Sequence, residues 1–571
     1  MADVAESMSR LNPFKSSGRR KDEDDDDQGD CLDLDSTGHR VHDDAVPKDR
    51  LSVSHALKSF LVHQGALPNA DDTDALRALV AAPHVHVPAA VTDRSYPLPE
   101  YFISSSHNTY LLAHQLYGTS SASAYDTAIK TGSRCVEIDA WDNSDDPDEP
   151  KVTHGFTLVS NIPFRRVCET IRDALDEEIA SSASAPTPIV LSLENHCDAA
   201  GQLRLVHIMR EVFGERLLSK PVRDEGHGEQ AGSAEHVTLA ELGSKIAVIV
   251  EYHISGEAID SDSDSDDSSD DEDAKAARKQ YKDKKKQAPT TIIIPELAEL
   301  GVYAQSVKPG DNSWFDPGEL ANGPHHHLIN VSESGLSAHL PANSTPIARH
   351  NSQHLMRVFP KGTRISSSNL RPVPFWGLGA QICALNWQTF GTSNQLNDAL
   401  FDGTGGYVLK PAALRSGSDG RLTTDRTTRL RLHVAGATDV PLPSDDVSAD
   451  SFRPYLTCTL YHPDKLKEAP AKRKTSPYKH HKLGFLHRGE NPPATDPIWD
   501  ETLEWEYADN ELVFLRLLVK NDESWAKNPN IAVVAVRLSY VQPGWRFIRM
   551  MDLKGRETKC SVLVKFEFEH V

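Results

Sequence analysis

Polar residues able to do acid–base or metal chemistry lie at the ends of four short apolar runs. These runs are YFISSS, CVEIDAWD, KVTHGF and LSLENH. The six residues at their ends are His107, Asn108, Glu137, Asp139, His154 and Glu194. Glu137 and Asp139 are two positions apart, so on a strand they share one face and both carboxylates can reach a single ion.

The chemistry of this set points to a hard cation and a phosphate. Three carboxylates and one amide oxygen suit Ca²⁺ or Mg²⁺ and suit Zn²⁺ or Cu²⁺ poorly. Two histidines beside such an ion can stabilise developing phosphoryl charge and protonate a leaving alkoxide. The hypothesis is therefore metal-assisted cleavage of a phosphate ester.

The elements that must position these side chains are short apolar runs alternating with helix-like segments. Eight runs are taken as strands: YFISSSHN, SRCVEIDAWD, KVTHGF, PIVLSLENH, KIAVIVEY, LGVYAQSVK, LMRVFPKG and GAQICALNWQ. This α/β alternation predicts a closed parallel (β/α)8 barrel of the TIM type. In such barrels the site lies at the carboxyl ends of the strands, which is where the six polar residues are placed.

Composition limits the classes of protein that the chain can belong to. A length of 571 residues predicts two to four domains. The formal net charge of −22 argues against general nucleic-acid binding. Because no long apolar run or apolar leader is present, we expect no membrane span. We expect a cytoplasmic location. Seven cysteines without a C-x-x-C pair predict neither a disulfide framework nor a zinc site. Cys135, Cys197 and Cys383 lie in apolar runs and are expected to be buried.

Composition breaks divide the chain. KDEDDDDQGD indicates a disordered tail, and DSDSDSDDSSDDED followed by a basic run indicates a disordered insert that splits the barrel. Alternation in RLRLHV, TLEWEY, VFLRLLV and VLVKFEFEHV predicts a β-sandwich. The expected divisions are 1–50 acidic tail, 51–92 short helical segment, 93–254 first barrel half, 255–290 linker, 291–415 second barrel half and 425–571 sandwich.

Several long blocks in order resemble the X and Y boxes of eukaryotic phosphoinositide-specific phospholipase C. They are HNTYLL, CVEIDAWD, VTHGFTL, LSLENHC, RHNSQHLMRVFPKGTRISSSN, GAQICALNWQT and GTGGYVLKP. The resemblance makes 93–254 the X half and 291–415 the Y half. It also makes 425–571 a C2 domain, as in the delta type, and 51–92 a possible EF-hand remnant, although no D-x-D-x-D-G calcium loop is present.

The resemblance implies an activity. This is calcium-dependent hydrolysis of phosphatidylinositol 4,5-bisphosphate, or of less phosphorylated forms, to diacylglycerol and inositol phosphates through a cyclic phosphodiester. Such an enzyme acts in lipid signalling as a peripheral protein at the cytoplasmic membrane face, and its protein partners are unknown. The implied calcium ligands are Asn108, Glu137, Asp139 and Glu194. Glu137 is also the implied base, His107 the transition-state donor and His154 the acid for the leaving group.

Substrate contacts implied by the resemblance are less complete. Arg357 matches an arginine that contacts ring phosphates, Phe359 replaces a tyrosine, and Asn330 replaces a phosphate-binding serine. At the end of the fifth predicted strand, Ile249 and Glu251 stand where the family has two lysines. A carboxylate there repels a polyphosphorylated headgroup. The sequence therefore predicts a weaker preference for the bisphosphate.

Membrane contacts are expected at two places. The resemblance places Leu116, Phe156 and Leu158 on a rim that inserts into the bilayer, with Thr363 in place of a tryptophan. In the sandwich, Arg453 replaces a calcium-binding aspartate. Asp445, Asp446, Asp522 and Glu523 leave calcium binding by this domain open, and a packing role is favoured. The acidic insert is interpreted either as a plain spacer or as a segment that blocks the site away from a membrane.

Two other classes of function remain open at this stage. One is a catalytically inactive phospholipase-like scaffold, although both histidines are present. The other is a glycerophosphodiester phosphodiesterase, which shares a barrel with histidine and carboxylate ligands but is not expected to carry the split halves or the sandwich. The tract His325–His327, in a Gly/Pro/Asn-rich stretch, is interpreted as a solvated loop.

Overall fold

The structure is a computed structural model. It describes residues 52–112, 119–155, 160–181, 186–223, 236–252, 292–308, 314–315, 320, 323–362, 364, 367–443, 451–466, 468–481, 491–522 and 530–571. The expectations for the acidic tail (1–50), the linker (255–290), the rim residues Leu116, Phe156 and Leu158, and for Thr363, Asp445, Asp446 and Glu523 fall outside these residues.

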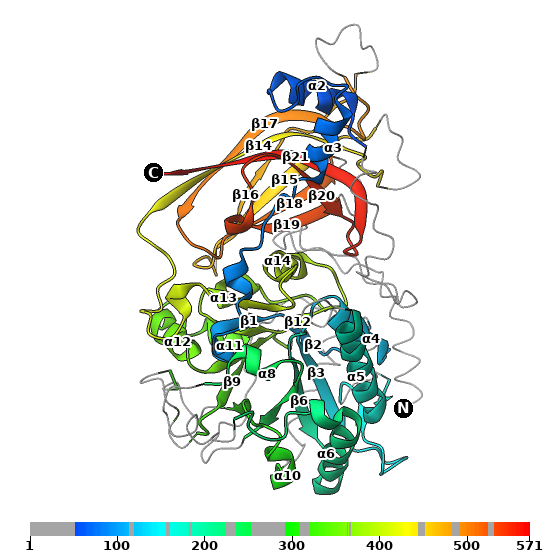
Figure 1. The fold of residues 1–571 in the computed structure, drawn as a ribbon, viewed down its shortest axis with the longest axis vertical. Helices are drawn as coiled ribbons and strands as arrows, with labels where there is room; N and C mark the ends of the chain where they lie inside the picture. The colour runs from blue at the N-terminus through cyan, green and yellow to red at the C-terminus, as the bar shows by residue number, and fades with distance from the viewer. Residues whose placement is uncertain are drawn as a thin grey trace, which may run out of the picture.

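Eight parallel strands form the barrel in the lower half of Figure 1. They are β1 (Tyr101–Ile103), β3 (Cys135–Trp141), β6 (Ile189–His196), β7 (Ile246–Glu251), β8 (Gln305–Val307), β9 (His327–Ser332), β10 (Leu355–Phe359) and β11 (Ile382–Cys383). The barrel closes because β1 pairs with β11 at Ile103 and Ile382, while Ser105 bridges in parallel to Cys135 at the start of β3. Two short strands, β2 (Ser106–His107) and β12 (Leu385–Asn386), extend β1 and β11 as a parallel pair. The predicted TIM-type barrel is confirmed.

One predicted barrel strand is wrong. The run KVTHGF contributes only β4 (Lys151–Val152), which pairs antiparallel with β3 and with β5 (Ile162–Pro163). Fewer than a dozen residues separate β3 from β4, too few for the crossover that a parallel neighbour requires. The eighth parallel strand is instead β9, which begins at His327, the last residue of the tract that the sequence analysis interpreted as a loop. A further strand, β13 (Tyr407–Leu409), pairs antiparallel with β1.

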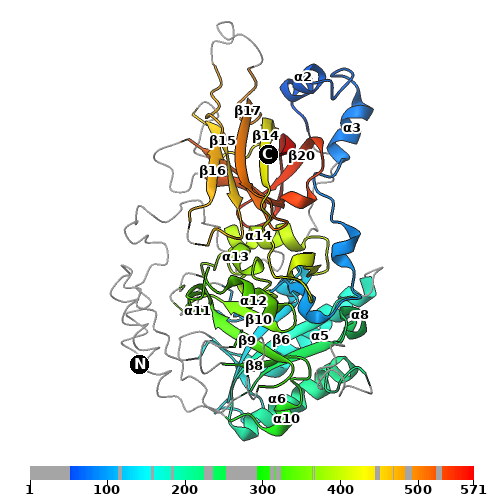
Figure 2. The ribbon, with the colours of Figure 1, turned by 90° about the vertical axis from the view of Figure 1, so that its left-hand side faces the viewer.

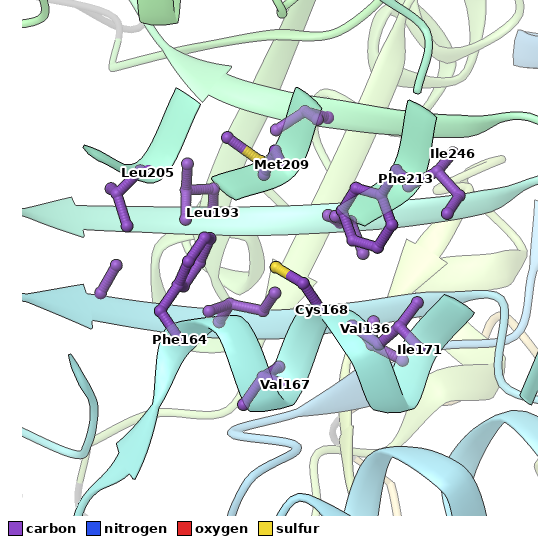
Figure 3. Close-up of a cluster of buried hydrophobic side chains, with 14 of the residues drawn as sticks. Val136, Phe164, Val167, Cys168, Ile171, Leu193, Leu205, Met209, Phe213 and Ile246 are labelled. Carbon is purple, nitrogen blue, oxygen red and sulfur yellow. The ribbon is translucent and has the colours of Figure 1, made fainter. Parts of the chain in front are cut away.

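Helices cover the outside of the barrel. They are α4 (Ser123–Lys130), α5 (Phe164–Ser181), α6 (Ala199–Phe213), α8 (Leu239–Leu242), α10 (Pro295–Ala298), α11 (Glu333–Ser337), α12 (Ser344–Asn351), α13 (Pro372–Trp376) and α14 (Thr392–Phe401). Figure 3 shows Phe164 and Cys168 of α5 and Met209 of α6 packed against Val136 and Leu193 on the outer faces of β3 and β6. This buried layer holds the strands in register.

The side chains that alternate with this outer layer point into the barrel. Buried apolar residues from seven strands meet inside the barrel: Ile103, Cys135, Val190, Ala247, Leu328, Leu355 and Ile382. Because side chains alternate with a period of two, the next inward positions toward the carboxyl ends are polar. On β3, β9 and β10 these are Glu137, Asn330 and Arg357. The barrel therefore changes from an apolar interior to a polar mouth along the same strand faces.

The second body is an eight-stranded antiparallel C2-like sandwich, in the upper half of Figure 1. Its strands are β14 (Thr427–Thr438), β15 (Pro454–Tyr461), β16 (Ala471–Lys474), β17 (Ile498–Ala508), β18 (Phe514–Asn521), β19 (Asn530–Arg537), β20 (Gly544–Met551) and β21 (Glu557–His570). The barrel meets it through α14, where the buried Arg516 donates from Nε to Gln395 Oε1 at 2.6 Å. A buried polar contact of this kind favours one docking arrangement of the two bodies.

The N-terminal helices belong to the sandwich side of the molecule. Figure 2 shows α2 (His55–His63) and α3 (Thr73–Ala81) beside β20. Leu57 and Leu61 of α2 pack in one cluster with Trp545 and Phe547. None of the helices described has the length and apolar run that crossing a bilayer requires.

The histidine tract is not a solvated loop, contrary to the sequence interpretation. His327 is buried and begins β9, with Nε2 lying 2.9 Å from Nε2 of His350. The ring of His354 stacks on His327 at 3.9 Å between centroids. Burial, chiefly, lowers the pKa of His327 to about 4 and that of His350 to about 3. The error arose because a run of histidines is polar in composition, whereas stacked neutral imidazoles pack as aromatic rings.

This packing predicts an acid-sensitive stability. The pKa of His350 is about 3 in the folded protein and about 6.5 in an unfolded chain, so between these values only the unfolded chain takes up the proton. Neutral His350 therefore contributes its full stabilisation of the folded protein above about pH 6.5. Below that pH, its contribution to the free energy of unfolding falls by about 1.4 kcal/mol per pH unit.

Urea unfolding at pH 7, 6, 5 and 4 measures this slope. In His350→Gln the free energy of unfolding should fall less steeply with decreasing pH, by the slope that corresponds to uptake of one proton. Replacing the exposed His207 by glutamine should leave the slope unchanged. Equal slopes in the parent and His350→Gln would contradict the prediction.

Candidate active site

Three carboxylates meet at the mouth of the barrel. Glu137 and Asp139 lie on the inner face of β3, and the parallel register sets Asp139 directly beside Glu194 of β6. One oxygen of each lies within 4.8 Å of an oxygen of the other two. Glu137 and Asp139 are buried and Glu194 is half-buried. The convergence expected from the strand ends is therefore present for this part of the set.

The electrostatics of this cluster are those of a cation site. Burial and the nearby Glu194 and Glu137 raise the pKa of Asp139 well above its usual range. Within the described residues, Oδ1 of Asp139 is buried and accepts no hydrogen bond. A buried acceptor lacking a donor and surrounded by like charge is costly unless a cation completes it. The all-oxygen donor set fits Ca²⁺ or Mg²⁺.

Asn108 joins the cluster through its backbone as well as its side chain. Its φ is +45°, a left-handed conformation that asparagine tolerates better than most residues. This turn aims its N–H at Oε2 of Glu137 at 2.7 Å. The hydroxyl of Tyr110 lies 2.6 Å from Asp139 Oδ2 and 3.1 Å from Asn108 Oδ1. Tyr110 thereby holds the amide oxygen and one carboxylate side by side.

His107 is oriented by a residue 279 positions later in the chain. Its Nδ1 lies 2.8 Å from Oδ1 of Asn386, and Asn386 is turned that way because its Nδ2 donates to the carbonyl of Ser368. An amide oxygen only accepts, so Nδ1 carries the hydrogen. Nε2 therefore points into the mouth, 3.9 Å from Oε2 of Glu137. Burial is the main factor lowering the pKa of His107.

Arg357 crosses the mouth from β10. It is buried, and its Nη2 donates to Oε1 of Glu137 at 2.6 Å while Nη1 donates to Oδ1 of Asn330 at 3.2 Å. Its guanidinium also lies 5.7 Å from the ring of Phe359. The three residues expected to contact substrate are thus together. In addition, Arg357 stabilises the negative charge of Glu137, a contact that sequence reasoning did not anticipate.

His154 lies directly after the residue that bonds to the end of β3. The N–H of Thr153 donates to the carbonyl of Asp139 at 3.2 Å. Gly155 follows, and a Cβ there would lie 1.8 Å from the ring of Trp141, so only glycine lets the chain pass. These contacts place the half-buried His154 at the same carboxyl end as the carboxylates.

Comparison with known proteins identifies the barrel. Residues 94–252 match the family described as phosphatidylinositol-specific phospholipase C, X domain, and residues 297–413 match the Y domain of the same enzyme class. The chain belongs to the eukaryotic phosphoinositide-specific phospholipase C family. The resemblance found in the sequence is therefore confirmed, and the split halves lie in the expected order.

Curated relatives of this phospholipase C chain carry the name 1-phosphatidylinositol 4,5-bisphosphate phosphodiesterase. The Dictyostelium discoideum protein is 31% identical, covering 85% of this chain and 61% of the relative. The human delta-1 protein is 31% identical, with 82% and 60% covered. The Candida albicans protein, phosphodiesterase 1, is 29% identical, covering 83% of this chain and 48% of the relative. The chain thus spans about half to three fifths of the length of these relatives.

A solved structure agrees with the phospholipase C fold. The crystal structure of S. officinalis PLC21 superposes with a TM-score of 0.68 at 26% sequence identity, covering 87% of this chain and 59% of that one. The likeness extends over more of the chain than the barrel alone. It therefore supports the barrel-plus-sandwich architecture described above.

Four residues at this phospholipase C site were missed by sequence reasoning. Asn386 orients His107, Tyr110 bridges Asn108 and Asp139, and the Tyr125 hydroxyl donates to the carbonyl of Glu137 at 2.8 Å. His196 lies 3.1 Å from Oε1 of Glu194 and stacks on Trp141. His196 ends β6 and Asn386 ends β12, the short extension of β11, so the strand-end rule that selected His107 could have found both.

At the end of β7, the fourth parallel strand of the barrel, the two residues named from the sequence are apolar and acidic rather than basic. Ile249 is buried in the barrel interior, paired in register with Ser192 of β6. Glu251 is two residues further along the same inward face, half-buried at the end of β7. By the two-residue period it lies level with Glu194, one strand away. The mouth therefore gains a fourth carboxylate here.

Proposed function

We propose that the chain is a calcium-dependent phosphodiesterase that hydrolyses phosphatidylinositol phosphates to diacylglycerol and inositol phosphates through a cyclic phosphodiester. The observation that carries the proposal is the buried oxygen of Asp139 that, within the described residues, accepts no hydrogen bond and lies in a three-carboxylate cluster. Beside this cluster, Nε2 of His107 faces the same mouth. A cation site and a proton-transfer group at one barrel mouth are what cleavage of a charged diester needs.

The proposed cofactor is Ca²⁺, held by Asn108, Glu137, Asp139 and Glu194. Their oxygens are the ligand type that Ca²⁺ takes, and the half-buried Glu194 leaves an approach from solvent. When bound, the ion supplies a Lewis acid that makes a substrate hydroxyl easier to deprotonate and offsets charge on the phosphoryl group.

In the proposed first step, Glu137 accepts the proton of the inositol 2-hydroxyl. The 2-oxygen then bonds to phosphorus while the bond from phosphorus to the glycerol oxygen breaks, and His154 gives that oxygen a proton. His107 donates from Nε2 to the phosphoryl oxygen. The growing negative charge there opposes the effect of burial on the imidazole and favours its protonated form. In the second step water opens the cyclic phosphate, with the acid and base roles exchanged.

Glu137 is well held for this role. Arg357 donates to one of its oxygens and the Asn108 N–H to the other, so its position is set from two sides. Arg357, Asn330 and Phe359 are proposed to line the headgroup site on the β9 and β10 side of the mouth. Tyr110 and Asn386 are proposed as positioning residues because each acts through another side chain.

Domain division and membrane attachment complete the proposal. The X half (93–254), the Y half (291–415) and the C2-like domain (425–571) form the working enzyme, and attachment is peripheral, at the cytoplasmic membrane face. The proposed lipid contacts on the rim rest on sequence alone. The sandwich is proposed to act as a packing module because Arg516 and α14 fix it against the barrel.

A release assay tests the function. Vesicles of phosphatidylinositol and its phosphorylated forms, and soluble glycerophosphoinositol, are incubated with the full chain in Ca²⁺ or in chelator. Release of inositol phosphate from the intact lipid, lost on chelation, is the expected result. Cleavage of only the soluble diester would indicate a glycerophosphodiester phosphodiesterase. No cleavage of either would indicate an inactive scaffold.

Glu251 predicts the headgroup preference. A carboxylate level with the cation site repels ring phosphates, so the ratio of bisphosphate to monophosphate turnover should be low. Replacing it, in Glu251→Lys, exchanges repulsion for attraction. A change of about 1.4 kcal/mol or more corresponds to a ratio at least tenfold higher.

Competition between the two lipids in mixed vesicles measures this ratio. The matched control is Glu296→Lys, which makes the same charge change at an exposed position of α10 outside the barrel. A high bisphosphate preference in the parent, or equal ratios in Glu251→Lys and the control, would refute the assignment.

A further inference from the structure

A second cluster of metal-binding side chains lies away from the mouth. His325 and His326 immediately precede β9, and His236 lies just before α8 and β7. These are the amino ends of parallel strands, whereas the carboxylates are at the carboxyl ends. The cluster therefore faces the opposite end of the barrel, and the proposed mechanism uses none of its residues.

The three imidazoles lie close together. One ring nitrogen from each of His236, His325 and His326 lies within 4.8 Å of the other two. The ring centroids of His325 and His326 are 4.7 Å apart, and the His236 ring lies nearly parallel to that of His325 at 5.8 Å. All three residues are half-buried. Three ring nitrogens this close together are a donor set that a transition metal can use.

Space for about one water molecule adjoins the cluster. A cavity of about 20 Å³ is lined by His236, His326, His354, Val237 and Tyr303, among others. This is room for about one water-sized group. Among the described residues, the charges that act on His326 are those of the histidines His325, His236 and His327. The donors at this end of the barrel are thus imidazole nitrogens, in contrast to the oxygens at the mouth.

We propose that His236, His325 and His326 bind one Zn²⁺ ion, with a water molecule as the fourth ligand. Imidazole suits Zn²⁺ and neighbouring transition metals and suits Ca²⁺ and Mg²⁺ poorly. Zn–N bonds of about 2.0–2.1 Å in a tetrahedral site bring the nitrogens to roughly 3.4 Å from one another. Because the nitrogens lie within 4.8 Å of one another, the rings need to close in by at most about 1.4 Å, which side-chain rotation at half-buried positions allows.

The site joins the two halves of the barrel. His236 belongs to the segment that matches the X domain, and His325 and His326 belong to the segment that matches the Y domain. An ion held by both closes a cross-link between segments that are distant in sequence, and an ion that binds only the folded protein stabilises it. Its role is structural, so turnover at the opposite end does not depend on it.

The test uses the full chain, freed of metal by chelation and dialysis, then titrated with Zn²⁺ in millimolar Ca²⁺ so that the oxygen ligands at the mouth are occupied. Equilibrium dialysis should give one Zn²⁺ per chain. At about 100 times Kd the melting temperature should rise by roughly 3–6 °C. Co²⁺ in place of Zn²⁺ should give visible absorption bands from nitrogen coordination.

Two variants decide between this site and others. His325→Gln should weaken Zn²⁺ binding by at least about 100-fold, since loss of a ligand costs no less than loss of a residue that only supports one. His236→Gln should do the same, and it serves if the first variant does not fold. His207→Gln, at an exposed histidine of α6, should bind as the parent does. Absence of tight Zn²⁺ binding, or binding that survives in the folded ligand variant, would overturn the proposal.

Discussion

Replacing His107 with alanine is expected to lower the rate of phosphoinositide hydrolysis roughly 10²- to 10³-fold while the protein stays folded. Nε2 of His107 points into the mouth beside Glu137, and removing one donor aimed at developing charge costs two to three decades in rate. His107 lies on the two-residue strand β2 and belongs to none of the large apolar clusters, so the barrel core is left intact.

The same loss is expected for His154→Ala, because the leaving glycerol oxygen then has no acid. Turnover on phosphatidylinositol vesicles in saturating Ca²⁺ measures both variants, and circular dichroism and the melting temperature check folding. His207→Ala is the matched control at an exposed helix position. Turnover close to the parental rate in either variant would remove that histidine from the mechanism.

Asn386→Leu tests whether His107 depends on its orienting partner. The variant keeps the imidazole but removes the acceptor of its Nδ1–H, so activity should fall less than in His107→Ala. The pH profile of kcat should also shift, because Asn386 favours the protonated imidazole. A lower rate with an unchanged profile would indicate a packing role only.

Asp139→Asn is expected to have opposite effects on activity and on the stability of the metal-free protein. Asparagine keeps the acceptor for the Tyr110 hydroxyl but removes a carboxyl group whose ionisation is opposed by burial and by the nearby Glu194 and Glu137. Relief of this repulsion should raise the free energy of unfolding in chelator, by up to about 3 kcal/mol. The same change removes a charged ligand, so Ca²⁺ affinity should fall by at least about 100-fold, and hydrolysis with it.

Melting temperatures with and without Ca²⁺ measure this prediction. Ca²⁺ should raise the melting temperature of the parent and leave that of Asp139→Asn unchanged over the same concentration range. Asp173→Asn, on the exposed face of α5, makes the same chemical change without touching the cluster. A variant less stable than the parent in chelator, or one that is still stabilised by Ca²⁺ as the parent is, would contradict a cation site at Asp139.

Local sequence was enough to place much of the site. Glu137, Asp139 and Glu194 were found because carboxyl ends of parallel strands share one edge and inward residues recur every second position. The buried cysteines and the antiparallel sandwich followed from apolar runs and alternation in the same way. The misplaced strand at KVTHGF shows the limit of this approach, since periodicity identifies an extended run but does not give its direction or its neighbour.

The amino-acid sequence by itself determined that Glu137, Asp139 and Glu194 reach the barrel mouth, because strand period and strand polarity are local properties of the chain. Only the tertiary structure decided what those residues touch. Arg357 meets Glu137 across 220 positions and His107 meets Asn386 across 279. Closure of the barrel also brings His236 to His325 and His326, at the end away from the mouth. Such contacts depend on which strands become neighbours when the barrel closes and on their register. No local pattern of residue types specifies these two properties.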